Sequence, residues 1–390
     1  MQLYLKINKP MNNTFLLFTI LSSQFIGFMR LGPFKILEVI LILWFILSLK
    51  LEIRIDDRGI TTLFWLFLAS FLWGMIMLVN TSLGDVVTDH LIYKPFIWNI
   101  FYFLQMLLIL FYMQKIMHYR DVIHINFKML LYVMILFQIL ICILQKLFFP
   151  PYDGLITGTF SEHGPLAMFI AMLVIFAHAK EIKVGWIFYT LAVGLLILTL
   201  GTRGILVFIV YFGWIAVQYA IRFFKERSSL YLISLVVFFI ICLFAFFASG
   251  YYISVLSKIE LYFQLVNNSD IHNIGRYASL TVTKRIFENF PLLGVGLGNY
   301  EFFRVMQPYM GNSIYLLPDY ANNIFLENLA EFGLIGSFIF WRVLFKWFKQ
   351  IGNKKIFCIF LLYALVSGKN DYNFWIFLGM FLIPREACHG

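Results

Sequence analysis

Twelve apolar segments, each near the length of a membrane-spanning helix, recur along this 390-residue sequence. A bilayer core about 30 Å thick is crossed by roughly 20 residues of α-helix. We therefore expect an all-α polytopic membrane protein with about twelve transmembrane helices, or eleven, because the last two segments are short and the first two are separated only by 30–32. The segments lie at 13–29, 33–49, 60–79, 95–113, 129–146, 164–179, 185–201, 204–221, 230–250, 323–341, 355–368 and 372–384.

The composition excludes the soluble classes of protein. Hydrophobic residues make up 62% of the chain and charged residues 13%, against about 45–50% and about 25% in soluble domains. A soluble fold of this size leaves too many residues at its surface to hide the excess, so the excess faces lipid. A secreted scaffold, a nucleic-acid-binding domain and a disordered chain are all excluded. The segments also lack the alternating pattern of an outer-membrane barrel.

Lysine and arginine predict the orientation, because they accumulate in cytoplasmic loops. With the N-terminus inside, 19 of the 30 basic residues fall on the inner side. Both termini are then cytoplasmic, and the chain 1–390 is a single integral membrane domain. The segment 251–322 becomes one large periplasmic loop, in which helical spacing predicts an amphipathic interfacial helix over 276–290. The net charge of +10 fits an anionic membrane surface better than nucleic acid.

Arginines at the expected outer face are the first candidate site residues. Arg203 lies between two spans and is followed by Gly204. It is either an anchor at the membrane interface or, with Thr202, a ligand of phosphate, which a planar guanidinium binds with two hydrogen bonds. Arg276, with Lys284 and Arg285, either attracts lipid headgroups or supplies further cations for the same anion.

Two polar patches and a glycine-rich turn are the other candidates. A polar stripe with a spacing of four residues begins one span, at Asn323, Glu327 and Glu331. Asn323 alone would indicate a hydrogen bond that holds two helices together. Two carboxylates at that depth in the membrane instead indicate function. Glu162 and His163 precede another span and carry groups suited to proton transfer. The turn around Gly296 is either structural or closes over a bound headgroup, since no strand or Walker lysine accompanies it.

Taken together, these patches resemble the O-antigen polymerase and O-antigen ligase family of bacterial inner-membrane glycosyltransferases. The resemblance covers roughly residues 150–340. It rests on a GTF loop, a TxSRG-like motif with threonine for serine, an arginine, an NPLxGxGxGNF-like turn and an HN-x9-G-x2-G motif. In this sequence these are Gly158–Phe160; Thr199, Thr202, Arg203 and Gly204; Arg276; Asn289–Tyr300; and Asn323, Gly333 and Gly336, with Asn322 at the histidine position.

The resemblance implies a polymerase of O-antigen or capsule-like polysaccharide in the bacterial inner membrane. Such an enzyme transfers a growing glycan from undecaprenyl pyrophosphate to another lipid-linked repeat unit at the periplasmic face. Arg203 and Arg276 would hold the pyrophosphate, with Glu327 and Asn322 also assigned to the catalytic site. Asn322 disfavours a ligase, because asparagine is no general base at neutral pH; Glu327, Asp319, Glu162 and His163 are candidate bases.

The partners expected are the undecaprenyl-pyrophosphate-linked oligosaccharide, the bilayer and a chain-length regulator. No cofactor or metal is expected, because no acidic pair has metal-ligand spacing. The nearer alternative is an O-antigen ligase or protein O-oligosaccharyltransferase of the same family. The alternative from another class is a flippase for lipid-linked oligosaccharide, but transporters bind near the midplane and show internal repeats, whereas here the polar residues gather at outer ends.

Overall fold

The structure is a computed structural model of the whole chain. It describes residues 13–25, 30–31, 34–48, 57–80, 94–121, 123, 125–148, 157–160, 163–199, 201–226, 275–304, 323–366 and 371–388. The predicted all-α fold is confirmed. The described residues contain one β-hairpin, which lies between the first two helices. Its two strands have two residues each and pair antiparallel: β1 (Arg30–Leu31) and β2 (Phe34–Lys35).

Eleven of the twelve expected segments coincide with helices, and the segment 230–250 lies outside the described residues. The first is the helix Asn13–Ser22, which ends in the short η1 (Ser23–Phe25). The others are α2 (Ile36–Ser48), α3 (Arg58–Asn80), α4 (Lys94–Tyr119), α5 (Phe127–Phe148), α6 (His163–Ala179), α7 (Trp186–Thr199), α8 (Thr202–Glu226), α13 (Ile324–Ile351), α14 (Lys354–Val366) and α15 (Tyr372–Leu382).

Four of these helices are long and apolar enough to cross a bilayer unaided. They are Arg58–Asn80, Phe96–Tyr119, Phe127–Phe148 and Ile324–Ile351. Six shorter apolar helices accompany them in the described part of the chain. At a rise of 1.5 Å per residue, the 14-residue α7 spans only about 21 Å. Eleven or twelve full crossings therefore stay a prediction, while the multi-helix membrane class is established.

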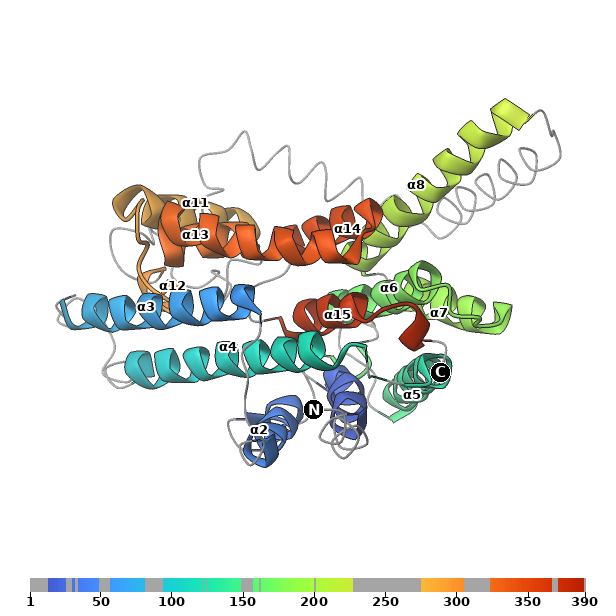
Figure 1. Cartoon of the computed structure of the whole chain (residues 1–390), viewed down its shortest axis with the longest axis horizontal. Coiled ribbons are helices and arrows are strands. Elements are labelled where there is room, and N and C mark those ends of the chain that lie inside the picture. The colour runs from blue at the N-terminus through green and yellow to red at the C-terminus, as the bar shows by residue number, and fades with distance from the viewer. Residues whose placement is uncertain are drawn as a thin grey trace.

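The helices form two connected groups (Figure 1). In one group α13 packs on α3, and α3 packs on α4. In the other, α6 packs on both α7 and α8, and α15 connects the groups through contacts with α4, α6 and α13. The helix α11 (Gly275–Asn289) packs on α13 at the far end of the first group, next to the short α12 (Tyr300–Phe303). This confirms the helix expected over 276–290.

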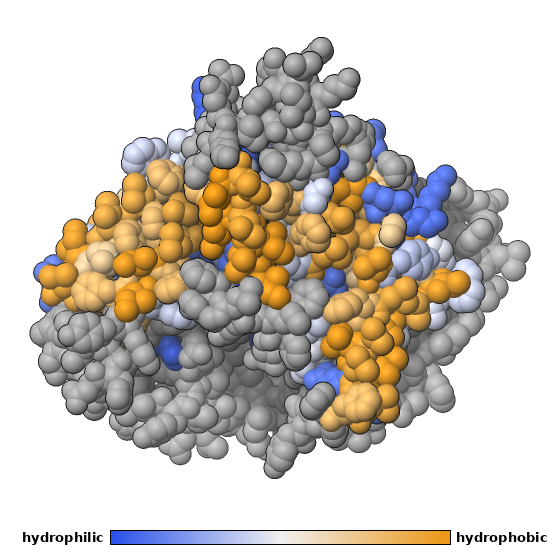
Figure 2. Space-filling model, turned by 90° about the horizontal axis from the view of Figure 1, so that it is seen from below, coloured by the Kyte–Doolittle hydropathy of each residue, from blue (hydrophilic) through white to orange (hydrophobic). Residues whose placement is uncertain are grey.

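Burial distinguishes the centre of the second group from its outside. Every side chain of α6 from Leu166 to Ala177 is at most 2% exposed, so α6 is surrounded by other helices. Large apolar side chains are instead exposed along α3, α5, α7 and α8, and Figure 2 shows broad apolar areas among the described residues of one face. An apolar exterior on this scale is suited to contact with lipid.

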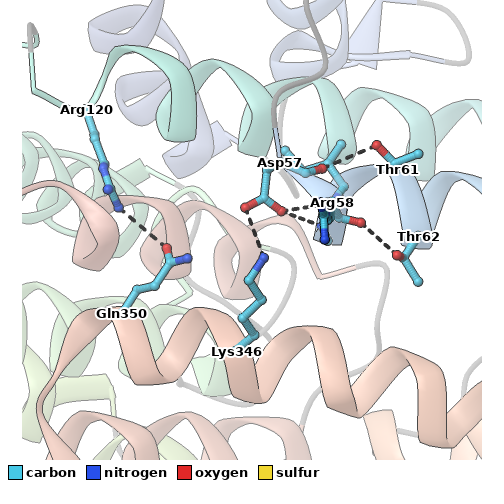
Figure 3. A network of polar contacts seen from close by, with 9 residues as sticks. Asp57, Arg58, Thr61, Thr62, Arg120, Lys346 and Gln350 are labelled. Atoms are coloured by element: carbon cyan, nitrogen blue, oxygen red, sulfur yellow. Dashed lines mark hydrogen bonds and ion pairs between the residues drawn. The ribbon is translucent and has the colours of Figure 1, made fainter.

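A polar network closes the ends of α3, α4 and α13 that the charge pattern assigns to the cytoplasmic side (Figure 3). Asp57 caps the start of α3, because its Oδ1 accepts hydrogen bonds from the backbone N–H groups of Gly59 and Ile60 at 2.6 and 3.2 Å. Its Oδ2 lies 3.6 Å from Nζ of Lys346 on α13. The carboxylate is thus both a helix cap and an ion-pair partner, which fixes the register between α3 and α13.

Candidate functional site

The helices α6 and α8 start side by side. A Cβ built on Gly204 would lie 2.2 Å from the backbone carbonyl of Ala167, so only glycine permits this crossing. Further along, Nδ1 of His178 on α6 is 3.1 Å from the hydroxyl of Tyr211 on α8. The two contacts occur in the same order along both helices, so α6 and α8 run parallel, and their N-terminal ends lie at the same end of the pair.

Arg203 lies at this shared end. A Cβ built on Gly164 would be 3.7 Å from Cδ and 3.8 Å from Nε of Arg203. The guanidinium therefore lies against the first turn of α6, which begins at His163. Unpaired backbone N–H groups give a helix N-terminus a partial positive charge. Two such termini and an arginine make a cationic position that suits an anion, above all a phosphate. Thr202 is the first residue of α8.

The predicted polar stripe at the start of α13 is largely buried. Asn323 is the N-cap, since its Oδ1 accepts hydrogen bonds from the backbone N–H groups of Phe325 and Leu326 at 3.0 and 3.2 Å. Glu327 is 2% exposed, and its Oε1 accepts a 2.7 Å hydrogen bond from the hydroxyl of Tyr102 on α4. The stripe thus supplies a cap and a buried carboxylate bonded to a neighbouring helix.

The glycine-rich turn fills a break in α13. Gly333 has φ 61° and ψ −163°, which interrupts the helix and leaves neighbouring backbone groups without helical partners. The turn replaces those partners: the N–H of Val295 donates to the carbonyl of Ala330 at 2.9 Å, and the N–H of Leu334 donates to the carbonyl of Pro291 at 2.8 Å. The last two family motifs are therefore one interlocked unit of structure.

Gly296 lies inside this unit. Its N–H donates to the carbonyl of Glu331 at 2.9 Å, and a Cβ built on it would be 2.2 Å from Cα of Gly74 on α3. Asn299 extends the contact, because its Nδ2 donates to the carbonyl of Gly74 at 2.9 Å and its Oδ1 accepts from Nδ2 of Asn99 at 2.8 Å. The turn is thus pressed between α3, α4 and α13, and its role toward a headgroup stays a prediction.

The helix α11, which carries the other predicted cations, packs on different helices from α8. Figure 1 shows α11 and the first turn of α8 in separate parts of the molecule, and α11 packs on α13 whereas α8 packs on α6, α7 and α14. Lys284 is exposed and lies 3.6 Å from Glu288, one turn further along α11, while Arg285 is half-buried. Arg276 is in the first turn of α11. The predicted pairing of Arg203 and Arg276 on one anion stays a prediction.

Three predicted site residues, Asn322, Asp319 and Glu162, lie outside the described residues. Other residues of the site were not identified from the sequence. Tyr102, Gln138 and Gln145 each lie within an apolar segment, and the structure gives each of them polar partners. An isolated polar side chain in a membrane span was the available signal.

Comparison with known proteins agrees with the sequence motifs. Residues 187–341 match the family model described as O-antigen ligase. The matched range begins in α7 and runs through α8, α11, the glycine-rich turn and the break in α13. No curated protein sequence matches the chain. Residues 187–341 are thus similar to the O-antigen ligase family, the family that the sequence motifs indicate.

Proposed function

We propose that this protein is a polysaccharide polymerase of the bacterial inner membrane that acts on undecaprenyl-pyrophosphate-linked oligosaccharide at the periplasmic face. The observation that carries the proposal is the position of Arg203 against Gly164, where α6 and α8 both begin. A pyrophosphate bound there would accept hydrogen bonds from the guanidinium of Arg203 and lie near the positive ends of two helix dipoles. The match to the O-antigen ligase family supports a lipid-linked glycan as the ligand.

The proposed reaction needs stabilisation of a leaving group. The hydroxyl oxygen of the acceptor sugar attacks C1 of the donor glycan, and the bond between C1 and the pyrophosphate oxygen breaks. Undecaprenyl pyrophosphate leaves with the electron pair, and the negative charge that develops on it is stabilised by Arg203. The acceptor's proton passes to a side-chain base. Glu162 and His163 are the candidate bases nearest to this position in the sequence, since α6 begins at His163.

Asn322 favours a polymerase over a ligase. The family's motif has histidine where this chain has Asn322, and an amide accepts no proton at neutral pH. A polymerase joins two lipid-linked glycans, so donor and acceptor carry the same lipid. A ligase, which transfers the glycan to a different acceptor, is the second candidate because the matched family model carries that description.

Reconstitution separates these activities. Purified protein in liposomes would receive lipid-linked repeat units alone, and then repeat units together with a lipid A core acceptor. We expect a ladder of products from repeat units alone, in which successive products differ in length by one repeat unit. Product formed only when the core acceptor is present would show a ligase and contradict the proposal. Movement of a labelled lipid-linked oligosaccharide between leaflets without any ladder would show a transporter.

A further inference from the structure

Two glutamines of α5 hold the loop that leads into α6. Oε1 of Gln145 accepts hydrogen bonds from the backbone N–H groups of Thr157 and Gly158, at 3.1 and 3.0 Å. Nε2 of Gln145 donates to Oγ1 of Thr157 at 2.8 Å. One side-chain amide therefore pairs with three groups of the loop, using both its acceptor and its donor.

Gln138, two turns earlier on the same face of α5, holds the next part of the loop. Its Nε2 donates to Oγ1 of Thr159 at 2.7 Å and to Oε1 of Gln24 at 3.1 Å. The backbone N–H of Thr159 donates to Oε1 of Gln138 at 3.4 Å, and the Thr159 hydroxyl donates to the carbonyl of Gln24. Gln138, Thr159 and Gln24 are each at most 2% exposed, so the cluster is sealed from lipid and water.

A side chain at position 158 would disturb this arrangement. Gly158 has φ 58°, and a Cβ built on it would be 2.6 Å from Oε1 of Gln138. Backbone N–H groups at this depth need partners, since lipid offers none. The two glutamines supply them, and in turn the loop offsets the cost of placing two amides in an apolar span.

The same loop packs on α6. Phe160 ends the described loop, is 5% exposed, and packs on Phe169 of α6 with ring centroids 5.3 Å apart. Only Ser161 and Glu162 separate it from His163, the first residue of α6. The next residue is Gly164, against which Arg203 lies. The described contacts therefore lead from α5 to the loop, from Phe160 to Phe169 of α6, and from the first turn of α6 to Arg203.

We propose that Gln138 and Gln145 are positioning residues for a pyrophosphate-lipid site at Arg203, and that they act by fixing the first turn of α6. This inference rests on the proposed function for its ligand. It assigns to these glutamines no contact with substrate. Their effect is on the binding of the donor, because the N-terminal turn of α6 and Arg203 must hold one geometry for a pyrophosphate to meet both.

Replacement by glutamate is expected to affect the two glutamines differently, and this difference tests the proposal. In Gln145→Glu the carboxylate still accepts from the N–H groups of Thr157 and Gly158, and the Thr157 hydroxyl can donate to it. In Gln138→Glu the carboxylate cannot donate to Oε1 of Gln24 or to Oγ1 of Thr159, so both bonds of Nε2 are lost. Gln145→Leu removes all three bonds to the loop. Leu140→Ala, at a position 53% exposed on α5, is the matched control.

Binding of undecaprenyl pyrophosphate to each purified variant in nanodiscs is the first measurement, made below the unfolding temperature of every variant. We expect Gln145→Leu and Gln138→Glu to raise Kd about tenfold or more, with Gln145→Glu and Leu140→Ala within about twofold of wild type. The inference is overturned if the wild type binds and Gln145→Leu binds equally well, or if the two glutamate variants behave alike.

Hydrogen exchange of residues 157–167 without ligand is the second measurement. Exchange faster than wild type is expected in Gln145→Leu and Gln138→Glu, and unchanged exchange is expected in the other two variants. Unchanged exchange in all four variants would overturn the inference whatever the ligand. Wild-type protein that fails to bind the lipid, with the exchange pattern as expected, would contradict the proposed function and leave the glutamines as supports of α6 alone.

Discussion

Tyr102 donates a 2.7 Å hydrogen bond to Oε1 of Glu327, and this bond joins α4 to α13. Both side chains are buried, at 4% and 2% exposure. A carboxylate in such surroundings depends strongly on its donors, because water cannot replace them. The pair is therefore a structural connection between helices as well as a feature of a predicted catalytic residue.

Replacing Tyr102 with Phe is expected to destabilise the protein. The substitution removes the donor to Glu327 and keeps the ring, so the expected loss is about 1–3 kcal/mol. Thermal unfolding in detergent measures it. Tyr219→Phe is the control, since Tyr219 is 64% exposed and its variant should unfold with the wild type. Equal melting of both variants would show that Glu327 does not depend on this bond.

Gly296→Ala is expected to disrupt the join between the glycine-rich turn and α3. The added methyl would lie 2.2 Å from Cα of Gly74, and the residue has φ 93°. Overpacking and the strained backbone together should cost about 3 kcal/mol or more. Gly213→Ala, with no atom within 4 Å of its added Cβ, should equal or exceed wild-type stability. Yield and melting temperature of the two variants distinguish them, and a stable Gly296→Ala protein would refute the packing described.

Lys180 is expected to make the free energy of unfolding increase with pH in the alkaline range. Its Nζ donates to the carbonyls of Phe381 and Ile383, which end α15, and burial lowers the pKa of the ammonium from its ordinary 10.5. Between the lowered pKa and 10.5 the unfolded chain binds more protons, so this group's contribution to stability rises with pH and is lost as pH falls through the lowered pKa.

The free energy of unfolding of wild type and of Lys180→Met, measured across that alkaline range, tests whether the contribution of Lys180 rises or falls with pH. The difference in stability, wild type minus variant, should increase as the pH rises toward 10.5. A difference that falls over the same range would mean that the folded protein holds the proton more tightly than the unfolded chain, contrary to the burial described.

The helices were predictable from the sequence because each apolar segment carries its own signal. The segment 60–79 became α3, and 129–146 became α5. The joins between them were not predictable. That Gly296 would meet Gly74, or that the turn would replace the helical partners lost at Gly333, depends on backbone contacts across more than 30 positions, which no local pattern encodes.

The candidate site shows the same division. The sequence singled out Arg203 from its glycine neighbours, and the structure adds the start of α6 beside it. It grouped Asn323, Glu327 and Glu331 as one polar stripe, whereas the structure gives them separate partners: the helix's own backbone, Tyr102, and the backbone N–H of Tyr300. The hydropathy pattern places Gln138 and Gln145 within the apolar segment 129–146, and it carries no information about their pairing with a loop.

The most direct test of the central claim is polymer formation by Arg203→Gln in liposomes that contain only lipid-linked repeat units. Arg342→Gln, which changes an exposed arginine of α13, is the matched control at equal protein density. We expect a product ladder from wild type and Arg342→Gln, and a rate of polymer formation at least about 100-fold lower from Arg203→Gln, as for the loss of one group that stabilises developing charge. A normal ladder from Arg203→Gln would contradict that claim.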